Sequence, residues 1–244
     1  MKKLSLSSVV DDFENEIEEI IARLIPSEPR SSRIKKIISA YQANTQVADY
    51  YFDRIFPKKI ANKSFPHWTP CHVAHRVLEL LSPSENSRIL DVGSGCGKFC
   101  LIAGLTNSKG HFTGIEQRQH LVTIAKEVKL EFEIKNVKFI HGNMSEVNWN
   151  DFDCFYFFNP FYEHIMNDSY FWVDETITLN KNHYDSYVQL VEEKLKTLKV
   201  GTRVVTYHGF GGAFPPEYTL LISEKINGRY SESFGLLDLW VKTS

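Results

Sequence analysis

The sequence predicts an α/β protein: a doubly wound, mostly parallel seven-stranded sheet with a C-terminal antiparallel hairpin, plus helices at the N-terminus. From about Arg88 onward, short apolar runs alternate with segments of helical periodicity, a pattern typical of parallel sheets with helices on both faces. The dipeptide Asn227-Gly228 separates the last two strand-like segments and is a strong hairpin-turn signal. The N-terminal segment instead shows isoleucines at helical spacing.

The N-terminal segment is expected to be mostly helical. Apolar residues at i, i+3, i+4 and i+7 predict a helix over about 9–25, which two prolines end. A second, interrupted helical stripe follows over 34–56. We interpret residues 1–66 as a helical extension or a cap on a main domain of residues 67–244, because binding clefts commonly lie between modules.

The main domain carries the alternation that predicts the sheet. Its first strand is a short apolar run followed directly by glycines, which indicates a buried strand leading into a tight turn. The expected strands lie at 88–92, 112–115, 137–141, 154–158, 202–207, 218–226 and 233–241. The expected helices of this domain lie at 71–81, 98–105 and 119–130.

Composition restricts the class of protein. The 244 residues are 43% hydrophobic and 24% charged, as in ordinary globular chains with one substantial core. The net charge is −2 and the basic residues are scattered, so binding to nucleic acid is not expected. No apolar stretch is long enough to span a bilayer, and the N-terminus is unlike a secretory signal. We therefore expect a cytoplasmic protein without a membrane partner; its oligomeric state stays open.

The cysteines give no sign of a metal site. Cys71, Cys96, Cys100 and Cys154 are irregularly spaced, without a C-x-x-C pair, whereas structural zinc sites use regularly spaced ligands. We expect four reduced thiols and no bound metal.

A glycine-rich turn after the first strand is the strongest functional signal. Gly93, Gly95 and Gly97 stand between a strand and a helix, where residues without Cβ allow close approach of the backbone to a ligand. A dinucleotide-binding fingerprint needs its third glycine one place later, and that place is Lys98. The spacing disfavours NAD, although an NAD-dependent oxidoreductase stays an alternative.

The stretch Asp91-Val92-Gly93-Ser94-Gly95-Cys96-Gly97 resembles the first motif of the class I (Rossmann-like) S-adenosylmethionine-dependent methyltransferases. The resemblance covers the chain from about Arg88 to the C-terminus, including the terminal hairpin, and leaves out the helical N-terminus. It implies an enzyme that uses S-adenosylmethionine as its cofactor and transfers the methyl group. A module that binds the cofactor without catalysing transfer is an alternative.

The same resemblance implies roles for residues at the strand ends. Asp91 would contact the ammonium of the cofactor, and Glu116 would accept both ribose hydroxyls, since one carboxylate offers two oxygens. Asn143 stands where the family has an aspartate that contacts the adenine amino group, and its carbonyl can still accept that hydrogen bond. The implied cofactor-binding residues are Asp91, Gly93, Ser94, Gly95, Gly97, Glu116, Gln117, Asn143, Met144 and Asn159.

A second motif follows the fourth strand, at the edge where ligands bind in doubly wound sheets. Asn159-Pro160-Phe161-Tyr162 resembles the N-P-P-Y/F motif of methyltransferases acting on amino nitrogens, with Phe161 in place of the second proline. The resemblance implies that Asn159 and Pro160 accept hydrogen bonds from the amine and that Tyr162 stacks on the substrate. These three are the candidate catalytic residues. Alternatively, Asn159 and Pro160 simply end the strand.

Two further resemblances bear on the methyl acceptor. His67-Trp68-Thr69-Pro70 is similar to a segment of the adenine-N6 methyltransferases, whereas Asn159-x-Phe161 with Gly114-Ile115-Glu116 is similar to the Dot1-type protein-lysine methyltransferases. Both imply transfer to nitrogen. We expect a small molecule or a protein as the acceptor, with an adenine-N6 nucleic-acid methyltransferase as the alternative.

Two other features belong to the expected cleft. The aromatic segment between Glu163 and Tyr184 is long for a connection inside a compact domain and could either close over a substrate or pack as a plain insertion. His208 follows the fifth strand and is a possible proton acceptor.

Overall fold

The computed structural model describes residues 28–45, 47–106, 109–227 and 234–244. Its first elements are four helices: α2 (Arg30–Gln42), α3 (Asp49–Asp53), α4 (Lys58–Ala61) and α5 (Ser64–His67). The helical stripe expected over 34–56 is confirmed as α2 and α3. The helix expected over 9–25 lies outside the described residues. The expected boundary between residues 66 and 67 falls within α5.

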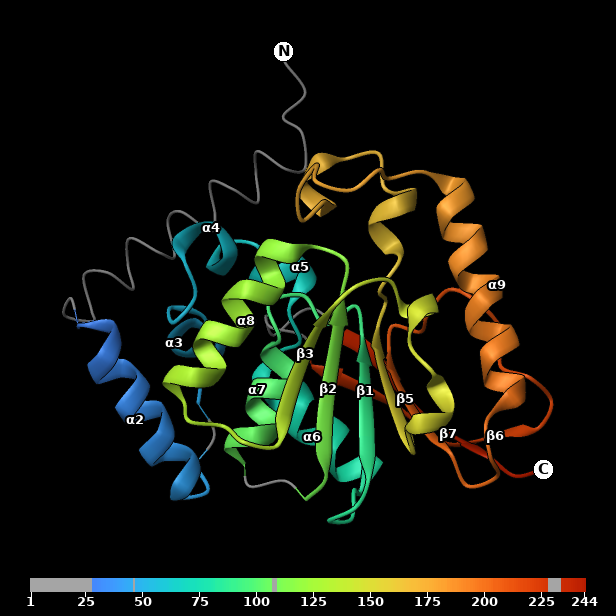
Figure 1. The fold of residues 1–244 in the computed structure, drawn as a ribbon, viewed down its shortest axis with the longest axis horizontal. Coiled ribbons are helices and arrows are strands. Elements are labelled where there is room, and N and C mark those ends of the chain that lie inside the picture. Colours follow the sequence, from blue (N-terminus) through green and yellow to red (C-terminus); the bar gives the residue numbers. More distant parts are fainter. Residues whose placement is uncertain (1–27, 46, 107–108, 228–233) are drawn as a thin grey trace.

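The sheet has the expected architecture. Its strands are β1 (Arg88–Val92), β2 (His111–Glu116), β3 (Val137–His141), β4 (Cys154–Phe158), β5 (Arg203–Tyr207), β6 (Tyr218–Asn227) and β7 (Phe234–Lys242). They are ordered β3-β2-β1-β4-β5-β7-β6. Strands β1 to β5 are parallel, and β7 runs antiparallel to both β5 and β6. The predicted fold class is thus confirmed (Figure 1).

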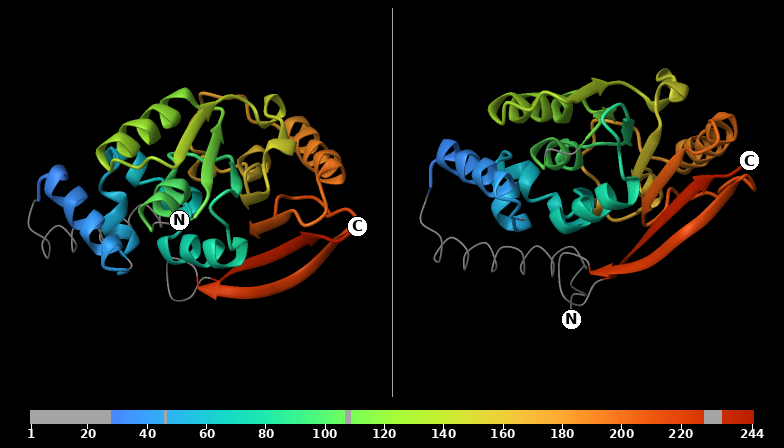
Figure 2. Two further views of the ribbon diagram at one scale, coloured as in Figure 1. Left: turned by 60° about the horizontal axis from the view of Figure 1, so that its bottom comes forward. Right: turned by 90° about the horizontal axis from the view of Figure 1, so that it is seen from below.

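Helices cover both faces of the sheet. The three expected helices are α6 (Cys71–Leu81), α7 (Lys98–Leu105) and α8 (Gln119–Glu131). A fourth, α9 (Lys181–Thr197), has no counterpart in the sequence analysis. It lies on the other side of the sheet from α6 and α7 (Figure 2). Its first turn is capped by the Asn180 side chain, which accepts a hydrogen bond from the backbone N–H of His183.

The two faces bury alternate residues of each strand, as the pleat requires. On β4, Cys154 and Tyr156 point into the core shared with α6, α7 and α8, whereas Phe155 and Phe157 point into the core shared with α9. The first core also contains apolar residues of α2, α3 and α4. The N-terminal helices therefore pack on the same face of the sheet as α6 to α8.

A buried ion cluster ties the N-terminal helices to the sheet domain. The side chain of Lys98, at the start of α7, is 1% exposed. Its Nζ lies 2.5 Å from Oδ1 of Asp49 and 2.6 Å from Oδ1 of Asp53, both on α3. Asp53 also accepts a hydrogen bond from Ser64 Oγ (2.6 Å). Because a buried charge is costly unless it is paired, these contacts fix α3 against the end of the glycine-rich turn.

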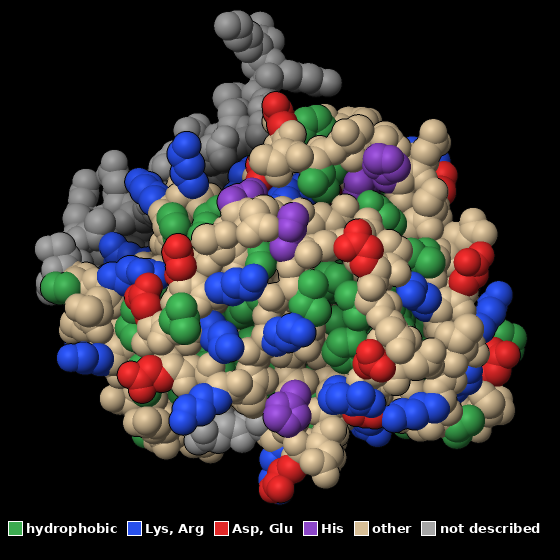
Figure 3. Space-filling view, viewed as in Figure 1, with side chains coloured by type: hydrophobic (Ala, Val, Ile, Leu, Met, Phe, Trp, Pro, Cys, Tyr) green, Lys and Arg blue, Asp and Glu red, His purple; other side chains and the backbone are tan. Residues whose placement is uncertain are grey.

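The surface is mixed in charge. Lys and Arg side chains are interspersed with Asp and Glu over the face drawn in Figure 3. Within the described ranges, no helix is long and apolar enough to cross a membrane.

Candidate functional site

A cavity of about 620 Å³ opens where the parallel strands end. The turns after β1, β2, β3, β4 and β5 all contribute to its wall, as does the segment from Phe65 to Trp68. A doubly wound sheet places its ligands at this edge. The N-terminal helices, through α5 and the residues after it, thus form part of the wall.

The glycine turn runs between two side chains that leave no room for Cβ atoms. Gly93 and Gly95 have φ of 76° and 54°, in the left-handed region that favours glycine. A Cβ on Gly95 would lie 2.4 Å from the ring of Trp68, and one on Gly93 would lie 2.9 Å from Cβ of Pro160. The turn therefore depends on glycine at both positions, and Trp68 supports it from the N-terminal side.

Glu116 ends β2 with a carboxylate that lines the cavity and is nearly buried. Oε2 accepts a hydrogen bond from the backbone N–H of Gly95 (3.1 Å), and Oε1 accepts one from that of Arg118 (2.9 Å). Burial raises the pKa of Glu116, and these donors and the Arg118 guanidinium oppose that shift. Each carboxylate oxygen can accept two hydrogen bonds. Glu116 can therefore hold the glycine turn and still accept from a ligand.

The cavity brings together most of the residues that the sequence singled out. Those that line it are Gly93, Gly95, Glu116, Gln117, Met144, Asn159, Pro160 and Tyr162. Asp91, Ser94, Gly97 and Asn143 are not among its lining residues. Their places in the fold explain why.

Three of these four residues have local structural roles. The side-chain oxygen Oδ1 of Asn143 accepts from the backbone N–H of Ser145 (2.9 Å) and caps a 3₁₀ turn. The side-chain NH₂ of Asn143 donates to the hydroxyl of Tyr187 (3.0 Å). Gly97 precedes α7 with φ of 80°. Ser94 is buried against Gly114. The side-chain oxygen of Asn143 thus already caps this turn. Its contact with the adenine amino group, which the resemblance implies, stays a prediction.

Asp91 lies buried behind the glycine turn. Its Oδ2 accepts from Sγ of Cys100 at 3.5 Å. Burial raises the pKa of Asp91 to about 7, Cys100 opposes the shift, and the nearby Glu116 adds to it. The contact with the cofactor ammonium, which the resemblance implies, stays a prediction.

The raised pKa of Asp91 predicts a pH-dependent stability. An acid whose pKa is higher in the folded than in the unfolded state contributes stability that is complete below about pH 4 and is lost as pH rises to about 7. Asp91→Asn removes this titration. The stability of the variant relative to wild type should therefore rise between about pH 4 and pH 7 and stay constant above pH 7, measured by thermal unfolding without cofactor. A difference in melting temperature that does not change with pH would contradict the assignment.

The motif after β4 adopts a strained turn at the cavity. Asn159 has φ of 38°, which is uncommon for a residue other than glycine. Its N–H donates to the carbonyl of Gly209 (3.2 Å), and its carbonyl accepts from the N–H of Tyr162 (3.3 Å). Phe161 is buried and packs against Tyr187, with ring centroids 5.4 Å apart. Asn159, Pro160 and Tyr162 all line the cavity, and backbone strain of this kind tends to persist at functional sites.

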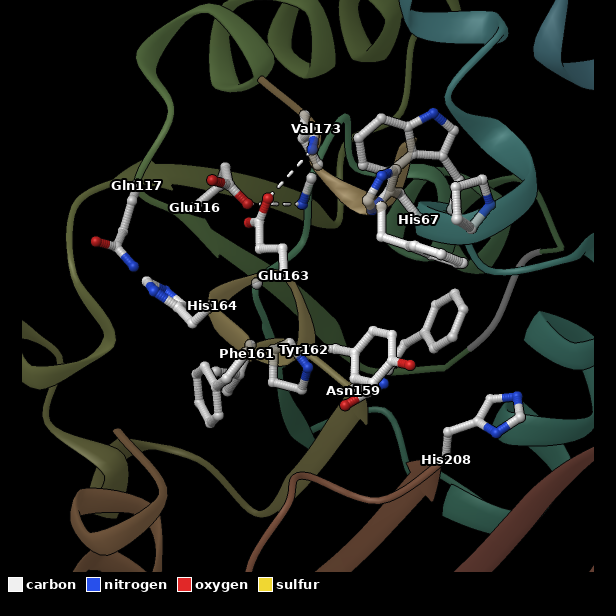
Figure 4. Close-up of a pocket in the computed structure, with 18 of the residues that line it drawn as sticks. His67, Glu116, Gln117, Asn159, Phe161, Tyr162, Glu163, His164, Val173 and His208 are labelled. Carbon is white, nitrogen blue, oxygen red and sulfur yellow. Dashed lines mark hydrogen bonds between the residues drawn. The ribbon is translucent and has the colours of Figure 1, made fainter. Parts of the chain in front are cut away.

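An ion cluster that the sequence analysis missed holds the aromatic segment over the cavity. Arg118 donates to both oxygens of Glu163 at 2.8 Å and, from Nε, to Asp174 at 2.9 Å. The backbone N–H of Val173 also donates to Glu163 (3.1 Å), as Figure 4 shows beside Glu116. These partners lie 45 and 56 residues from Arg118, so no local spacing could reveal them. The aromatic segment is thus fastened beside Glu116, and whether it closes over a substrate stays a prediction.

Comparison with known proteins assigns the chain to a protein family. Residues 83–206, just over half of the chain, match the model of a family described as a methyltransferase domain. The chain belongs to this methyltransferase family. This family assignment agrees with the methyl transfer from S-adenosylmethionine that the glycine-turn motif implies. The assignment supports methyl transfer over the NAD-dependent alternative.

Individual relatives of this methyltransferase match shorter stretches. An arsenite methyltransferase from Mus musculus is 40% identical over 70 residues, which are 26% of this chain and 19% of the relative. A tRNA (guanine-N(7)-)-methyltransferase from Prochlorococcus marinus is 38% identical over 69 residues, 28% of this chain and 33% of the relative. The matches thus span at most about a third of these two curated relatives.

A solved structure has the same fold. The RNA methyltransferase from Salinibacter ruber, in complex with S-adenosyl-L-homocysteine, superposes with a TM-score of 0.51 at 20% identity, over 72% of this chain and 94% of that one. Since relatives include enzymes for tRNA, the expectation that nucleic acid is not a partner gains no support.

The methyltransferase cavity fits the cofactor. S-adenosylmethionine supplies a methyl group on a positively charged sulfonium. The charged residues that line the cavity are Glu116, Arg118 and Glu163 besides histidines, so the wall is acidic overall. Aromatic side chains, including those of Trp68 and Tyr162, line it as well, and the faces of such rings can attract a cation. Glu116 is the residue that would hold the ribose hydroxyls.

The assignment to Glu116 makes a quantitative prediction. Glu116→Ala should weaken cofactor binding by about 1–3 kcal/mol, because two hydrogen bonds are lost and the tie to Gly95 is removed. Isothermal calorimetry measures this change. Glu127→Ala, at an exposed position on α8, is the matched control and should bind as wild type does. An unchanged affinity in Glu116→Ala would place the ribose elsewhere.

Proposed function

We propose that the enzyme transfers the methyl group of S-adenosylmethionine to a nitrogen atom of a small molecule or a protein. The observation that carries this proposal is the left-handed turn that places Asn159 at the cavity wall, next to Pro160 and Tyr162. The side-chain oxygen of Asn159 and the carbonyl of Pro160 are hydrogen-bond acceptors suited to an amine. They would hold its N–H groups so that the lone pair points at the methyl carbon.

Methyl transfer from S-adenosylmethionine requires mainly that the reacting atoms be correctly positioned. The sulfonium is already a good leaving group, so in-line alignment of nitrogen, carbon and sulfur supplies most of the acceleration. Trp68 and residues of the aromatic segment line the cavity, and apolar side chains at this position would limit the access of water to the reacting atoms.

A nitrogen acceptor is favoured here over a thiophilic acceptor such as arsenite, which appears in the name of the mouse relative. Soft acceptors are held by thiolates. The four cysteines of the chain are buried, and none lines the cavity. Burial raises the pKa of each of these thiols, which keeps them protonated.

The test is transfer of label from methyl-labelled cofactor to a panel of acceptors. The panel contains an aminoquinoline, an aliphatic diamine, a lysine-containing peptide, arsenite with a thiol, and bulk tRNA. We expect label on an amine or the peptide, with mass spectrometry placing the methyl group on nitrogen. Label on tRNA alone would favour the nucleic-acid alternative. Tight cofactor binding without transfer to any acceptor would favour a non-catalytic module.

A further inference from the structure

The end of β5 lies beside the motif that follows β4. Phe158 and Tyr207 are paired in register on these neighbouring parallel strands. Asn159 and His208 are therefore the next residues of the two strands, and both line the cavity. The hydrogen bond from Asn159 N–H to the Gly209 carbonyl (3.2 Å) joins the two turns. His208 is thus fixed next to the residue expected to hold the acceptor nitrogen.

His208 is held in the same unusual conformation as its neighbour. Its φ is 61°, again in the left-handed region. Its N–H donates to the carbonyl of Leu236 (2.9 Å) on β7, which fixes the backbone. Few residues other than glycine adopt this region, and asparagine and histidine are among those that do so most readily. Both non-glycine residues that follow the central strands β4 and β5 adopt it, so two successive turns at this edge of the sheet share one backbone conformation.

The imidazole is open to the cavity. His208 is exposed, and its ring makes no hydrogen bond to any residue in the described part of the chain. Figure 4 shows it on the side of Asn159 and Tyr162, across the cavity from Glu116 and Gln117. The ring packs against two aromatic neighbours. Its centroid lies 4.3 Å from the ring centroid of Tyr207 and 6.1 Å from that of Phe158. Partial desolvation of the ring beside these aromatic neighbours lowers the pKa of His208, so the imidazole is neutral and able to take a proton near neutral pH.

Methyl transfer to nitrogen releases one proton. An ammonium has no lone pair and must lose a proton before it attacks, whereas a methylated aryl amine or amide loses an N–H afterwards. Glu163 is paired with Arg118, and Glu116 lies across the cavity from Asn159 (Figure 4). The other two histidines that line the cavity are less available: burial lowers the pKa of His67 to about 3, and His164 is buried with Nδ1 accepting from the N–H of Asn180 (3.4 Å). Among the described residues, the imidazole of His208 is therefore the accessible base beside Asn159.

We propose that His208 accepts the proton that leaves the acceptor nitrogen. The nitrogen lone pair forms the bond to the methyl carbon, the carbon–sulfur bond breaks with its electron pair on sulfur, and the proton passes to a ring nitrogen of His208 and then to water. This inference rests on the proposed function, because it takes the acceptor atom to be nitrogen.

The test uses variants that respect the backbone conformation. Asparagine and glycine both tolerate positive φ, so His208→Asn and His208→Gly should fold as wild type does, checked by circular dichroism and melting temperature. With the panel member that takes up label, we expect both variants to lower kcat about a hundredfold or more. The dissociation constant of the cofactor should stay within about twofold, because no cofactor-binding group is removed.

Chemical rescue separates a proton acceptor from a structural residue. Added imidazole should restore turnover in His208→Gly in proportion to its concentration, because it can occupy the space left by the side chain. His111→Phe, at an exposed position at the start of β2, is the control and should keep wild-type turnover. Full activity in His208→Asn, or a folded His208→Gly that imidazole does not rescue, would overturn the proposal.

The same experiment distinguishes this proposal from the broader one. If mass spectrometry places the methyl group on oxygen or sulfur while imidazole still rescues His208→Gly, the nitrogen acceptor is wrong and the base is right. If the methyl group is on nitrogen and His208 is dispensable, the reverse holds.

Discussion

Lys98→Met is expected to lower the free energy of unfolding by about 3–5 kcal/mol, the usual cost of breaking a buried ion pair by removing one partner. The lysine is 1% exposed and lies between Asp49 and Asp53. Methionine keeps most of the volume but removes the positive charge that lies between the two carboxylates. Chemical denaturation, followed by far-ultraviolet circular dichroism, measures the change.

Two further variants identify the cause of that loss. Lys126→Met, at an exposed position on α8, is the matched control and should change stability little. The triple variant Lys98→Met, Asp49→Asn, Asp53→Asn removes all three charges and should recover much of the lost stability, because amide oxygens can still accept from Cys71 N–H and Ser64 Oγ. If the single variant is as stable as wild type, the cluster does not hold α3 in place.

The Lys98 cluster also links stability to binding. The cluster fixes α3, which is followed along the chain by α4, α5 and then Trp68. The ring of Trp68 packs against Gly95 of the glycine turn. Loosening α3 would release this wall of the cavity. Lys98→Met should therefore also weaken cofactor binding, although Lys98 is not among the residues that line the cavity.

The sheet could be predicted because its signals are local. Each parallel strand is a short apolar run bounded by turn residues, and the boundaries expected for β1, β3 and β4 agree with the structure. The glycine turn was equally accessible, since Asp91 and the glycines at 93, 95 and 97 lie between a strand and a helix and together resemble the first methyltransferase motif. The resemblance also identified Glu116 as a candidate, because it stands at the end of β2.

What the sequence did not reveal depends on long-range contacts or on weak patterning. Helix α9 buries only Val191 and Leu195 fully, so its apolar stripe is faint. The spacing of Tyr184, Val188, Val191 and Leu195 is nevertheless helical and could have identified the helix. The contacts of Arg118 with Glu163 and of Lys98 with Asp49 carry no sequence signal, because the partners lie 45 and 49 residues apart.

Asn159→Ala is expected to lower kcat by about a hundredfold, the typical result of misplacing a reacting group. The dissociation constant of the cofactor should change little, because the lost amide would act on the acceptor. Single-turnover kinetics with labelled cofactor, together with calorimetry, separate the two quantities.

The backbone of Asn159 complicates the alanine variant, and glycine removes the complication. Alanine at φ of 38° adds strain of about 1–2 kcal/mol, which could itself displace the turn and reduce turnover. Asn159→Gly lacks the same side chain but adopts this φ without strain. If the side-chain oxygen positions the nitrogen, both variants lose turnover to a similar extent. If glycine restores wild-type kcat while alanine does not, the conformation of the turn matters and the amide does not, and the positioning role of Asn159 is wrong.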